Sequence, residues 1–372
     1  MLQTTAMAWG SPSRYIQGPG ELLRLPEHTE KYGERVFAVI DSYFYDSLTK
    51  RLTEVCEAKE RAFASVPYEY EITLKSIELA TQKAKEFAPA VIVGIGGGKT
   101  LDTAKAVADN LSLPVVIVPT SASTDAPTSA MSIIYTEEHE HLLARYYKKS
   151  PDLVLVDSQI IAEAPVRFLV SGMGDALATV FEGRASIRTN SPNYVCQESG
   201  SYRRCRTAAA ICELCYQTIL ENGTQAKLAN ELHVVTEALE AVIEANTLMS
   251  GLGFENVGCA ASHVVCNGIT AAPNGAKALH GEKVAFGVIC QLVAENAPRE
   301  HLEEVLDFCK SVGLPLTLED MGVEETEENF DIISANTQET EWTREPFYMD
   351  DEKVKAVVKT ANALGHQWHA KK

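Results

Sequence analysis

A cluster of glycines between an apolar run and a helix-forming run is the part of this sequence best suited to binding an anion. Residues 91–105 read Val-Ile-Val-Gly-Ile-Gly-Gly-Gly-Lys-Thr-Leu-Asp-Thr-Ala-Lys. A strand that turns through glycines into a helix directs backbone N–H groups and the positive end of the helix dipole toward one point. Because glycine has no Cβ, an anion can approach this backbone closely. The pattern predicts a phosphate or pyrophosphate site.

The positions of the glycines in this loop differ from those in the two common phosphate-binding motifs. A Walker A loop that ends at Gly98, Lys99 and Thr100 needs a glycine where the chain has Val93. The Rossmann pattern starting at Gly94 needs a glycine where the chain has Lys99. A tight turn without a ligand is the plainer interpretation, but this many glycines give more backbone freedom than a turn requires. We therefore favour phosphate binding.

An acidic residue upstream points to the identity of the dinucleotide. Residues 35–40 indicate a buried strand, and Asp41 follows it. An acidic side chain at that position accepts hydrogen bonds from both hydroxyls of an adenosine ribose and repels a 2′-phosphate. A solvated turn aspartate is the alternative. Together with the glycine loop, Asp41 favours NAD over NADP.

Two histidines and an aspartate among small residues suggest a metal site. Asp175 lies where a helix is expected to begin after glycines, and His263 and His280 lie in small-residue surroundings. Two imidazoles and one carboxylate suit Zn²⁺ or Fe²⁺ and leave coordination positions open. In the alternative interpretation each histidine is a hydrogen-bonded core residue. A rival set of Cys259, His263 and Cys266 spans about 10 Å of helix, too far for one ion to reach both thiolates, since two Zn–S bonds span about 4.6 Å.

These residues need a scaffold, and the first half of the chain predicts an α/β fold. Apolar β-branched runs alternate with helical patterns: strands at 35–40, 90–93, 114–118 and 153–156, and helices at 73–87 and 101–110. Continuous β-branched runs between helices are typical of a parallel sheet covered on both faces. We expect a doubly wound parallel sheet that binds a nucleotide.

The second half predicts an all-helical domain. A chain of 372 residues usually divides into two domains, and the strand patterns stop near residue 165. We therefore predict an NAD-binding α/β domain at 1–165 and a helical metal-binding domain at 166–372. Helical patterns cover 208–220, 226–251, 301–312 and 350–364, whereas 189–206 has the composition of a loop. Cys212 and Cys215 form a C-x-x-C within a helical pattern, which favours ordinary helix cysteines over a redox pair.

Composition indicates which binding partners and which cellular compartment to expect. The net charge is −18, which disfavours binding to nucleic acid and to anionic membranes. No apolar run approaches the about 18 residues of a membrane span. The N-terminal residues do not resemble a signal peptide, and nine cysteines then indicate reduced thiols. We expect a cytoplasmic protein.

Four segments taken together resemble the glycerol-oxidising branch of the iron-containing (group III) alcohol dehydrogenase family. They are residues 94–105 (GIGGGKTLDTAK), 118–129 (VPTSASTDAPTS), 250–255 (SGLGFE) and 279–287 (LHGEKVAFG). The resemblance runs in order from about residue 15 to about residue 361. It implies a dehydroquinate synthase-like fold, with the active site in a cleft between the α/β domain and the helical domain.

The resemblance also implies roles for individual residues. Asp175, His263 and His280 match the ligands of a catalytic Zn²⁺, with Fe²⁺ as the alternative metal. The positions matching the NAD site are Asp41, Gly96, Gly97, Gly98, Lys99, Thr100, Thr120, Ser121, Ser123, Ser129, Met131 and Tyr135. Asp125 matches a residue that contacts the polyol, and Phe254 matches an apolar wall near the substrate.

The activity implied is the reversible, NAD- and zinc-dependent oxidation of glycerol to dihydroxyacetone. The alternatives are a broader 1,2-diol or alcohol dehydrogenase, a glycerol-1-phosphate dehydrogenase, a dehydroquinate-synthase-like lyase and a catalytically silent scaffold. The glycerol-1-phosphate dehydrogenase and the lyase act on anionic substrates and would need more basic residues around the metal than Lys277 and Lys283 of the matched segments. A silent scaffold need not keep all three metal ligands. A homo-oligomer, with an octamer as the family's precedent, is also implied.

Two departures from the family pattern stand out. Many relatives have a histidine where this chain has Cys266. The segment 190–206 lacks the Ala- and Gly-rich character typical of relatives, and we expect it to touch none of the matched ligands.

Overall fold

A parallel sheet forms the centre of the first half of the molecule. The computed structural model describes residues 5–68, 71–139, 141–197, 199–337 and 342–371. Within these residues six strands form the sheet: β1 (Tyr15–Gly18), β2 (Arg35–Asp41), β3 (Ala62–Tyr68), β4 (Val91–Gly96), β5 (Val115–Pro119) and β8 (Leu153–Asp157). They lie in the order β1-β8-β5-β4-β2-β3, and these pairings are parallel. The predicted doubly wound parallel sheet is confirmed.

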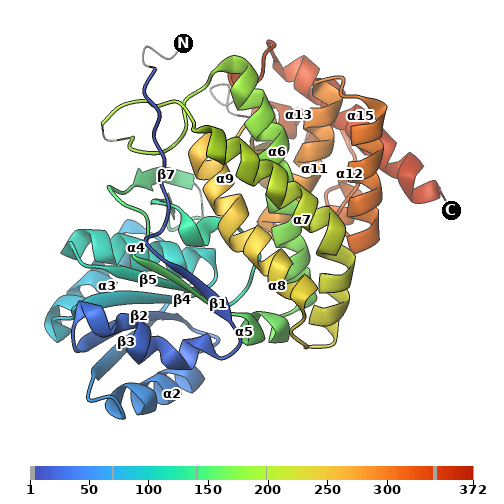
Figure 1. Ribbon diagram of the computed structural model, residues 1–372. Coiled ribbons are helices and arrows are strands. Elements are labelled where there is room, and N and C mark those ends of the chain that lie inside the picture. Colours follow the sequence, from blue (N-terminus) through green and yellow to red (C-terminus); the bar gives the residue numbers. More distant parts are fainter. Residues whose placement is uncertain (1–4, 69–70, 140, 198, 338–341, 372) are drawn as a thin grey trace.

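Different helices cover the two faces of this sheet, with α2 on one side and α3 and α4 on the other (Figure 1). Because successive strand residues point to opposite faces, Val36 and Ile40 pack with Leu52 of α2, whereas Phe37 packs in the core that contains Leu101 of α4. The helices of this half are α1 (Leu25–Thr29), α2 (Tyr45–Glu57), α3 (Leu74–Phe87), α4 (Gly98–Leu111) and α5 (Ser158–Glu163).

The predicted strands and helices of this half are found within a few residues of their expected bounds, but the sequence patterns did not indicate β1 and β3. These two strands lie at the edges of the sheet. Edge strands are less enclosed than central ones, so they need no continuous β-branched run, and β3 even contains Pro67. An antiparallel hairpin of β6 (Met131–Tyr135) and β7 (His141–Tyr146) was also missed.

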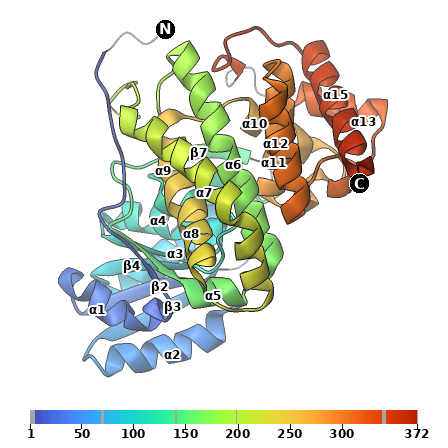
Figure 2. The same ribbon diagram turned by 45° about the vertical axis from the view of Figure 1, so that its right-hand side comes forward.

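Beyond residue 165 the described chain forms helices and turns, apart from an isolated bridge between Arg203 and Met7 (Figure 2). The α-helices are α6 (Val166–Thr189), α7 (Arg206–Glu231), α8 (Glu237–Glu244), α9 (Ser250–Val257), α10 (Ala261–Ala271), α11 (His280–Ala294), α12 (Arg299–Val312), α13 (Glu327–Ala335) and α15 (Asp351–Ala370). The expected helical half is confirmed. Among the described helices, none combines the length and apolarity needed to cross a membrane.

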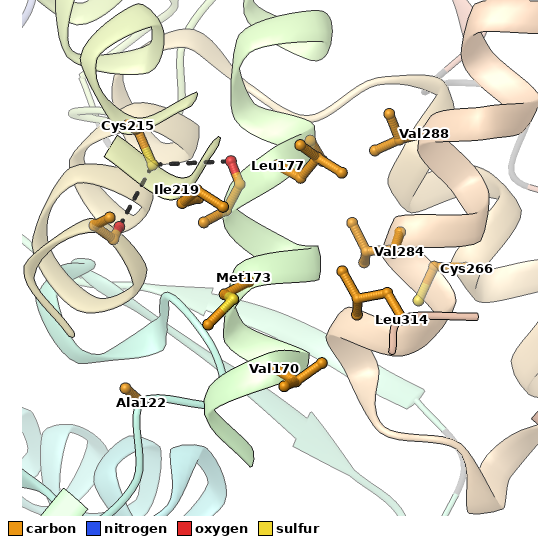
Figure 3. Close-up of a cluster of buried hydrophobic side chains, with 14 of the residues drawn as sticks. Ala122, Val170, Met173, Leu177, Cys215, Ile219, Cys266, Val284, Val288 and Leu314 are labelled. Atoms are coloured by element: carbon orange, nitrogen blue, oxygen red, sulfur yellow. Dashed lines mark hydrogen bonds between the residues drawn. The ribbon is translucent and has the colours of Figure 1, made fainter. Parts of the chain in front are cut away.

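The long helix α6 lies at the centre of this half, between α7 and α11 (Figure 3). Met173 of α6 and Val284 of α11 belong to one buried cluster that also contains Cys212 and Cys215 of α7. Both cysteines are free thiols, and Sγ of Cys215 donates to the carbonyl oxygen of Ala245 at 3.5 Å. Both residues are thus helix cysteines, as predicted, and the structure places them in the core.

The continuous helix expected over residues 226–251 was wrong. α7 ends at Glu231, and His233 adopts a left-handed backbone conformation with φ of 56°. A new helix, α8, then starts after Thr236, whose side chain accepts the backbone N–H of Leu239. A π-helical turn (Ala245–Met249) connects α8 to α9. The apolar periodicity concealed this turn, because a local threonine cap and one left-handed residue were sufficient to produce it.

Candidate active site

Asp175 lies within α6 and not at the start of a helix, so that expectation was wrong. The preceding glycines also lie within this helix, and glycine is needed at both positions because neighbouring backbone atoms are very close. A Cβ at Gly172 would lie 1.9 Å from the carbonyl oxygen of Ala122, and one at Gly174 would lie 2.3 Å from that of Gly281. The glycines thus let α6 approach both the loop after β5 and the start of α11. Asp175, which is 1 % exposed, lies between these two elements.

His263 and His280 converge on Asp175 from two other helices. His263 lies in the first turn of α10, and His280 is the first residue of α11. Their Nε2 atoms lie 3.4 and 3.3 Å from Oδ1 of Asp175, and their ring centroids are 5.3 Å apart. One ligand atom from each of the three side chains lies within 4.8 Å of the other two. The fold therefore brings together the three residues that the sequence analysis grouped.

The chemistry of this set fits a metal ion. Oδ1 of Asp175 is buried and accepts no hydrogen bond from the described residues, whereas Oδ2 accepts the backbone N–H of Asp125 at 3.2 Å. A buried carboxylate oxygen without a hydrogen bond is costly unless a cation lies beside it. Two imidazole nitrogens and a carboxylate are ligands that Zn²⁺ and Fe²⁺ accept. The His280 side chain is 42 % exposed, so the site is open to solvent on that side.

The electrostatics of the cluster favour an ionised Asp175. Burial raises the pKa of this carboxyl, but the adjacent His280 and His263 more than offset that effect and hold its pKa well below the ordinary range. Asp125 behaves in the opposite way. Burial and the nearby Asp175 carboxylate raise the pKa of Asp125 to about 7. Asp175 is therefore the carboxylate better suited to attract a cation.

A second group of potential ligands, Glu182, Cys259 and His263, shares one histidine with the first. Both oxygens of its carboxylate are already engaged, since Glu182 accepts the backbone N–H of Ala260 at 2.8 Å and lies 2.8 Å from Nδ1 of His263. The rival set with both thiols also has no support in the geometry, because Sγ of Cys266 faces Nδ1 of His280 at 3.6 Å. A further group, Glu319, Glu325 and His366, lies at the surface, where exposed acidic groups are common without a metal.

The glycine loop joins β4 to α4 as predicted. Gly96 ends the strand, Gly97 precedes the helix, and α4 begins at Gly98. A Cβ on Gly96 would lie 2.7 Å from Oγ1 of Thr100 and 2.9 Å from Cβ of Asp41, so a larger residue does not fit. No side chain caps α4, and the N–H groups of its first turn are therefore available to an anion. Thr100 donates to Oδ2 of Asp41 at 3.4 Å, which places the acidic residue beside the loop.

Lys99 of this loop is engaged in an ion pair. Its Nζ lies 2.6 Å from Oε2 of Glu71 and 4.8 Å from the centre of the Tyr135 ring. Glu71 also lies 2.9 Å from Nδ1 of His139, and its own side chain is 5 % exposed. The fold thus brings Lys99 and Tyr135 together, and it adds Glu71, which the sequence analysis did not single out.

The segment after β5 runs beside the glycine loop. The backbone N–H of Thr120 donates to the carbonyl oxygen of Gly96 at 3.0 Å. The hydroxyl groups of Ser121 and Ser123 lie 3.1 Å apart and form a hydrogen bond. Thr120 therefore lies beside the glycine loop, and Ser121 and Ser123 follow it closely in the chain.

A buried lysine connects the next part of this segment to α4. Nζ of Lys105 donates to Oγ of Ser129 at 3.3 Å and to the carbonyl oxygen of Met131 at 3.1 Å. It also donates to Asp102 at 3.1 Å, and Asp102 accepts the backbone N–H of Ile133. Sequence analysis missed this pair. Its signal is two opposite charges three residues apart in a helical run, 100–108, whose other residues are Thr, Leu, Ala and Val.

Asp125 and Phe254 lie on opposite sides of a contact between the two halves. Asp125 is 8 % exposed, and its Oδ2 accepts the hydroxyl of Ser250 at 3.1 Å. Ser250 begins α9, and Phe254 lies one turn farther along the same helix face. The two positions matched to the substrate are thus linked through one helix.

The divergent segment 190–206 borders this region at Phe254, one of the two positions matched to the substrate. The ring of Tyr194 lies 6.5 Å from that of Phe254, between centroids. The Tyr194 hydroxyl accepts the backbone N–H of Cys259 at 3.2 Å. The segment is distant from Phe254 in sequence, so only packing reveals the contact.

Comparisons with known proteins find similar alcohol dehydrogenases. The family model described as iron-containing alcohol dehydrogenase matches residues 12–158. The chain is similar to a glycerol dehydrogenase of Thermotoga maritima, with 47 % identity over 84 % of each chain. It is also similar to a glycerol dehydrogenase of Citrobacter freundii, with 40 % identity over 97 % of this chain and 98 % of the relative. A crystal structure described as a probable glycerol dehydrogenase from Sinorhizobium meliloti superposes with a TM-score of 0.91, at 37 % identity over 98 % of this chain and all of that one.

Proposed function

The chain belongs to the iron-containing alcohol dehydrogenase family and is an oxidoreductase, and we propose that it oxidises glycerol to dihydroxyacetone. We further propose NAD as the oxidant, a zinc ion in the active site, and a division into domains at residue 165. The observation that carries the proposal is the convergence of Asp175, His263 and His280, with a buried carboxylate oxygen that has no hydrogen bond from the described residues. We propose glycerol as the substrate because the similar proteins are named glycerol dehydrogenases.

The proposed metal ligands are Oδ1 of Asp175 and Nε2 of both histidines. When bound, zinc supplies Lewis acidity that lowers the pKa of a substrate hydroxyl, and NAD supplies the hydride acceptor. The task of the side chains is to present their lone pairs toward one point, and the distances of 3.4 and 3.3 Å from the two Nε2 atoms to Oδ1 of Asp175 support this assignment. Three protein ligands leave positions open for the substrate.

The proposed dinucleotide site lies at the carboxyl ends of the strands, where ligands of open parallel sheets bind. The first-turn N–H groups of α4, reached through Gly97 and Gly98, would hold the pyrophosphate. Asp41 would accept hydrogen bonds from the adenosine ribose. The remaining positions would line the path toward the metal: Thr120, Ser121, Ser123, Ser129, Met131 and Tyr135.

A neutral polyol suits the charges around the site better than a phosphorylated one. Asp125 would accept a hydrogen bond from the hydroxyl next to the reacting carbon, which favours vicinal diols. The matched segments contribute two lysines, of which Lys283 donates to Thr270 at 2.6 Å and Lys277 donates to Asn274 at 2.8 Å. An anionic substrate would need more cationic groups near the metal, as unpaired phosphate charge is costly to desolvate.

The test is the formation of NADH from glycerol and NAD, followed by absorbance before and after treatment with EDTA, with ZnCl₂ then added back. We expect activity that EDTA abolishes and zinc restores. Zinc-dependent turnover of another diol without turnover of glycerol would contradict the substrate but keep the site. An enzyme that binds zinc and turns over no alcohol would contradict the proposed activity, and activity insensitive to chelation would contradict the metal.

A further inference from the structure

A buried carboxylate on α6 contacts the metal-facing histidine from behind. Glu182 lies two turns after Asp175 on the same helix, and it is 1 % exposed. Its Oε1 accepts the backbone N–H groups of Ala260 at 2.8 Å and of His263 at 3.0 Å. Its Oε2 lies 2.8 Å from Nδ1 of His263. Both oxygens are therefore used, and the charge sits at the N-terminal end of α10, where the helix dipole favours it.

This contact determines which nitrogen of His263 carries the proton. An ionised carboxylate only accepts hydrogen bonds, so Nδ1 must donate to Glu182. In a neutral imidazole the lone pair then resides on Nε2, the atom that lies 3.4 Å from Oδ1 of Asp175. Glu182 thus prepares His263 as a ligand, and its own oxygens are not available to a metal.

Cys266 makes a weaker contact of the same kind with Nδ1 of His280. Sγ of Cys266 lies 3.6 Å from Nδ1 of His280 and 3.9 Å from the carbonyl oxygen of the same residue. When the thiol donates its hydrogen to that carbonyl oxygen, a sulfur lone pair faces Nδ1. The same tautomer is selected, with a lone pair on Nε2. Sulfur is a weak acceptor, so this imidazole is held less firmly than His263.

We propose that Glu182 is a positioning residue of the metal site, which holds the Nδ1 proton of His263 so that Nε2 is the nitrogen left for the metal, and that Cys266 does the same more weakly for His280. This inference rests on the metal site proposed above. It assigns different roles to two neighbouring groups of potential ligands: Asp175 and the histidines bind the metal, and Glu182 orients one of them. Partners of this kind typically change metal affinity by about 10- to 100-fold.

The Glu182→Gln variant separates positioning from structural support. A glutamine can keep Oε1 on the two backbone N–H groups, and this conserves the cap of α10. Its NH₂ group then faces Nδ1 of His263, where it must donate, and the imidazole proton moves to Nε2. The reverse amide orientation would place the NH₂ group against two backbone donors, so it is disfavoured. The variant should therefore fold as the wild type does and bind metal poorly.

The experiment measures the zinc affinity of the apo-protein by competition with a chromophoric chelator, with thermal unfolding of the same apo-protein alongside. We expect Glu182→Gln to weaken zinc binding about 10- to 100-fold while the unfolding temperature of the apo-protein changes little. Cys266→Ala should weaken zinc binding by a smaller factor, and Cys266→Ser should restore it, because a hydroxyl also accepts from Nδ1. Cys56→Ser, at a buried cysteine of α2 in the other half, is the matched control.

Unchanged zinc affinity in Glu182→Gln would overturn the proposal, as would a loss of affinity that only parallels a loss of apo-protein stability. If Glu182→Gln does not fold, the Cys266 pair decides: equal zinc affinities of the alanine and serine variants would overturn the positioning role of Cys266 and with it the shared mechanism. Failure of the metal site itself gives a different result, since wild-type protein and His280→Ala would then bind zinc equally.

Discussion

The backbone N–H of Asp125 donates a 3.2 Å hydrogen bond to Oδ2 of Asp175. Asp125 belongs to the segment that follows β5 of the sheet, and Asp175 lies in α6 of the helical half. The bond therefore joins the two halves of the molecule at the candidate metal site. It also occupies one oxygen of Asp175, which leaves Oδ1 facing His263 and His280.

The His280→Ala variant should lose activity while it retains dinucleotide binding. His280 contributes one of the proposed ligands from the first residue of α11, far from the glycine loop in the chain. We expect zinc affinity to fall and NADH formation from glycerol to drop by at least about 100-fold, since the loss of a ligand exceeds the about 10- to 100-fold effect of an outer partner. NADH fluorescence titration should give a dissociation constant near that of the wild type. His301→Ala, at an exposed histidine of α12, is the control, and wild-type turnover in His280→Ala would contradict the assignment.

The Asp41→Ser variant should accept NADP. Asp41 ends β2 beside Gly96, and its Oδ1 accepts the backbone N–H of Tyr43 at 3.0 Å. Removal of the carboxylate removes its repulsion of a 2′-phosphate. We expect the ratio of kcat/KM for NADP to that for NAD to rise by at least about tenfold, equivalent to about 1.4 kcal/mol. Asp46→Ser, at an exposed residue of α2, should leave the ratio unchanged. An unchanged ratio in Asp41→Ser would remove this residue from the ribose site.

Two glycine-to-alanine variants in α6 should differ in stability. At Gly172 a Cβ would lie 1.9 Å from the carbonyl oxygen of Ala122, so Gly172→Ala forces backbone apart and should cost at least about 2 kcal/mol of unfolding free energy. At Gly183 the nearest atom is 3.5 Å away, which is ordinary contact. Gly183→Ala should be neutral or stabilising by up to about 1 kcal/mol, because alanine favours the helix. Urea unfolding of both variants checks the difference, and equal stabilities would show that the close approach of α6 is not required.

Glu255 should make stability fall with rising pH. It is 3 % exposed and accepts the backbone N–H of Ala130 at 2.8 Å, and burial raises its pKa from the ordinary 4.5 to about 7. Between these two values the folded protein binds more protons than the unfolded one, so this residue makes the unfolding free energy decrease as pH rises. Glu255→Gln removes the effect, and its stability relative to the wild type should increase by roughly 1–3 kcal/mol from pH 5 to pH 8. Urea unfolding at both pH values measures this, and a gain independent of pH would be inconsistent with titration of Glu255.

Local sequence was sufficient for the elements whose signals are local. The glycine loop, the strand before it and α4 follow from contiguous residues, because β-branched runs, glycines and helix formers act over a few positions. The position of Asp41 at the end of a strand was predicted for the same reason, since it directly follows such a run. The edge strands β1 and β3 and the turn at His233 were missed. Their signals are weak in sequence, and neighbouring elements or a single cap decide them.

The convergence of the site was decided by tertiary structure. Residue types and the family resemblance singled out Asp175, His263 and His280, but their approach depends on Gly172 and Gly174, which let α6 come close to the loop after β5 and to α11. Nothing in their spacing indicates that these helices meet.

The same holds for the partners of the site. Glu182 and Glu71 were found only in the fold, because each acts through atoms brought close by packing of distant segments. The Lys105–Asp102 pair is local, but its contacts with Ser129, Met131 and Ile133 also depend on packing. Sequence by itself determined which chemical groups this protein has and the elements that carry them. Tertiary structure decided which of these groups face one another, since hydrogen bonds and ion pairs depend on distances of a few ångströms that local periodicity does not set.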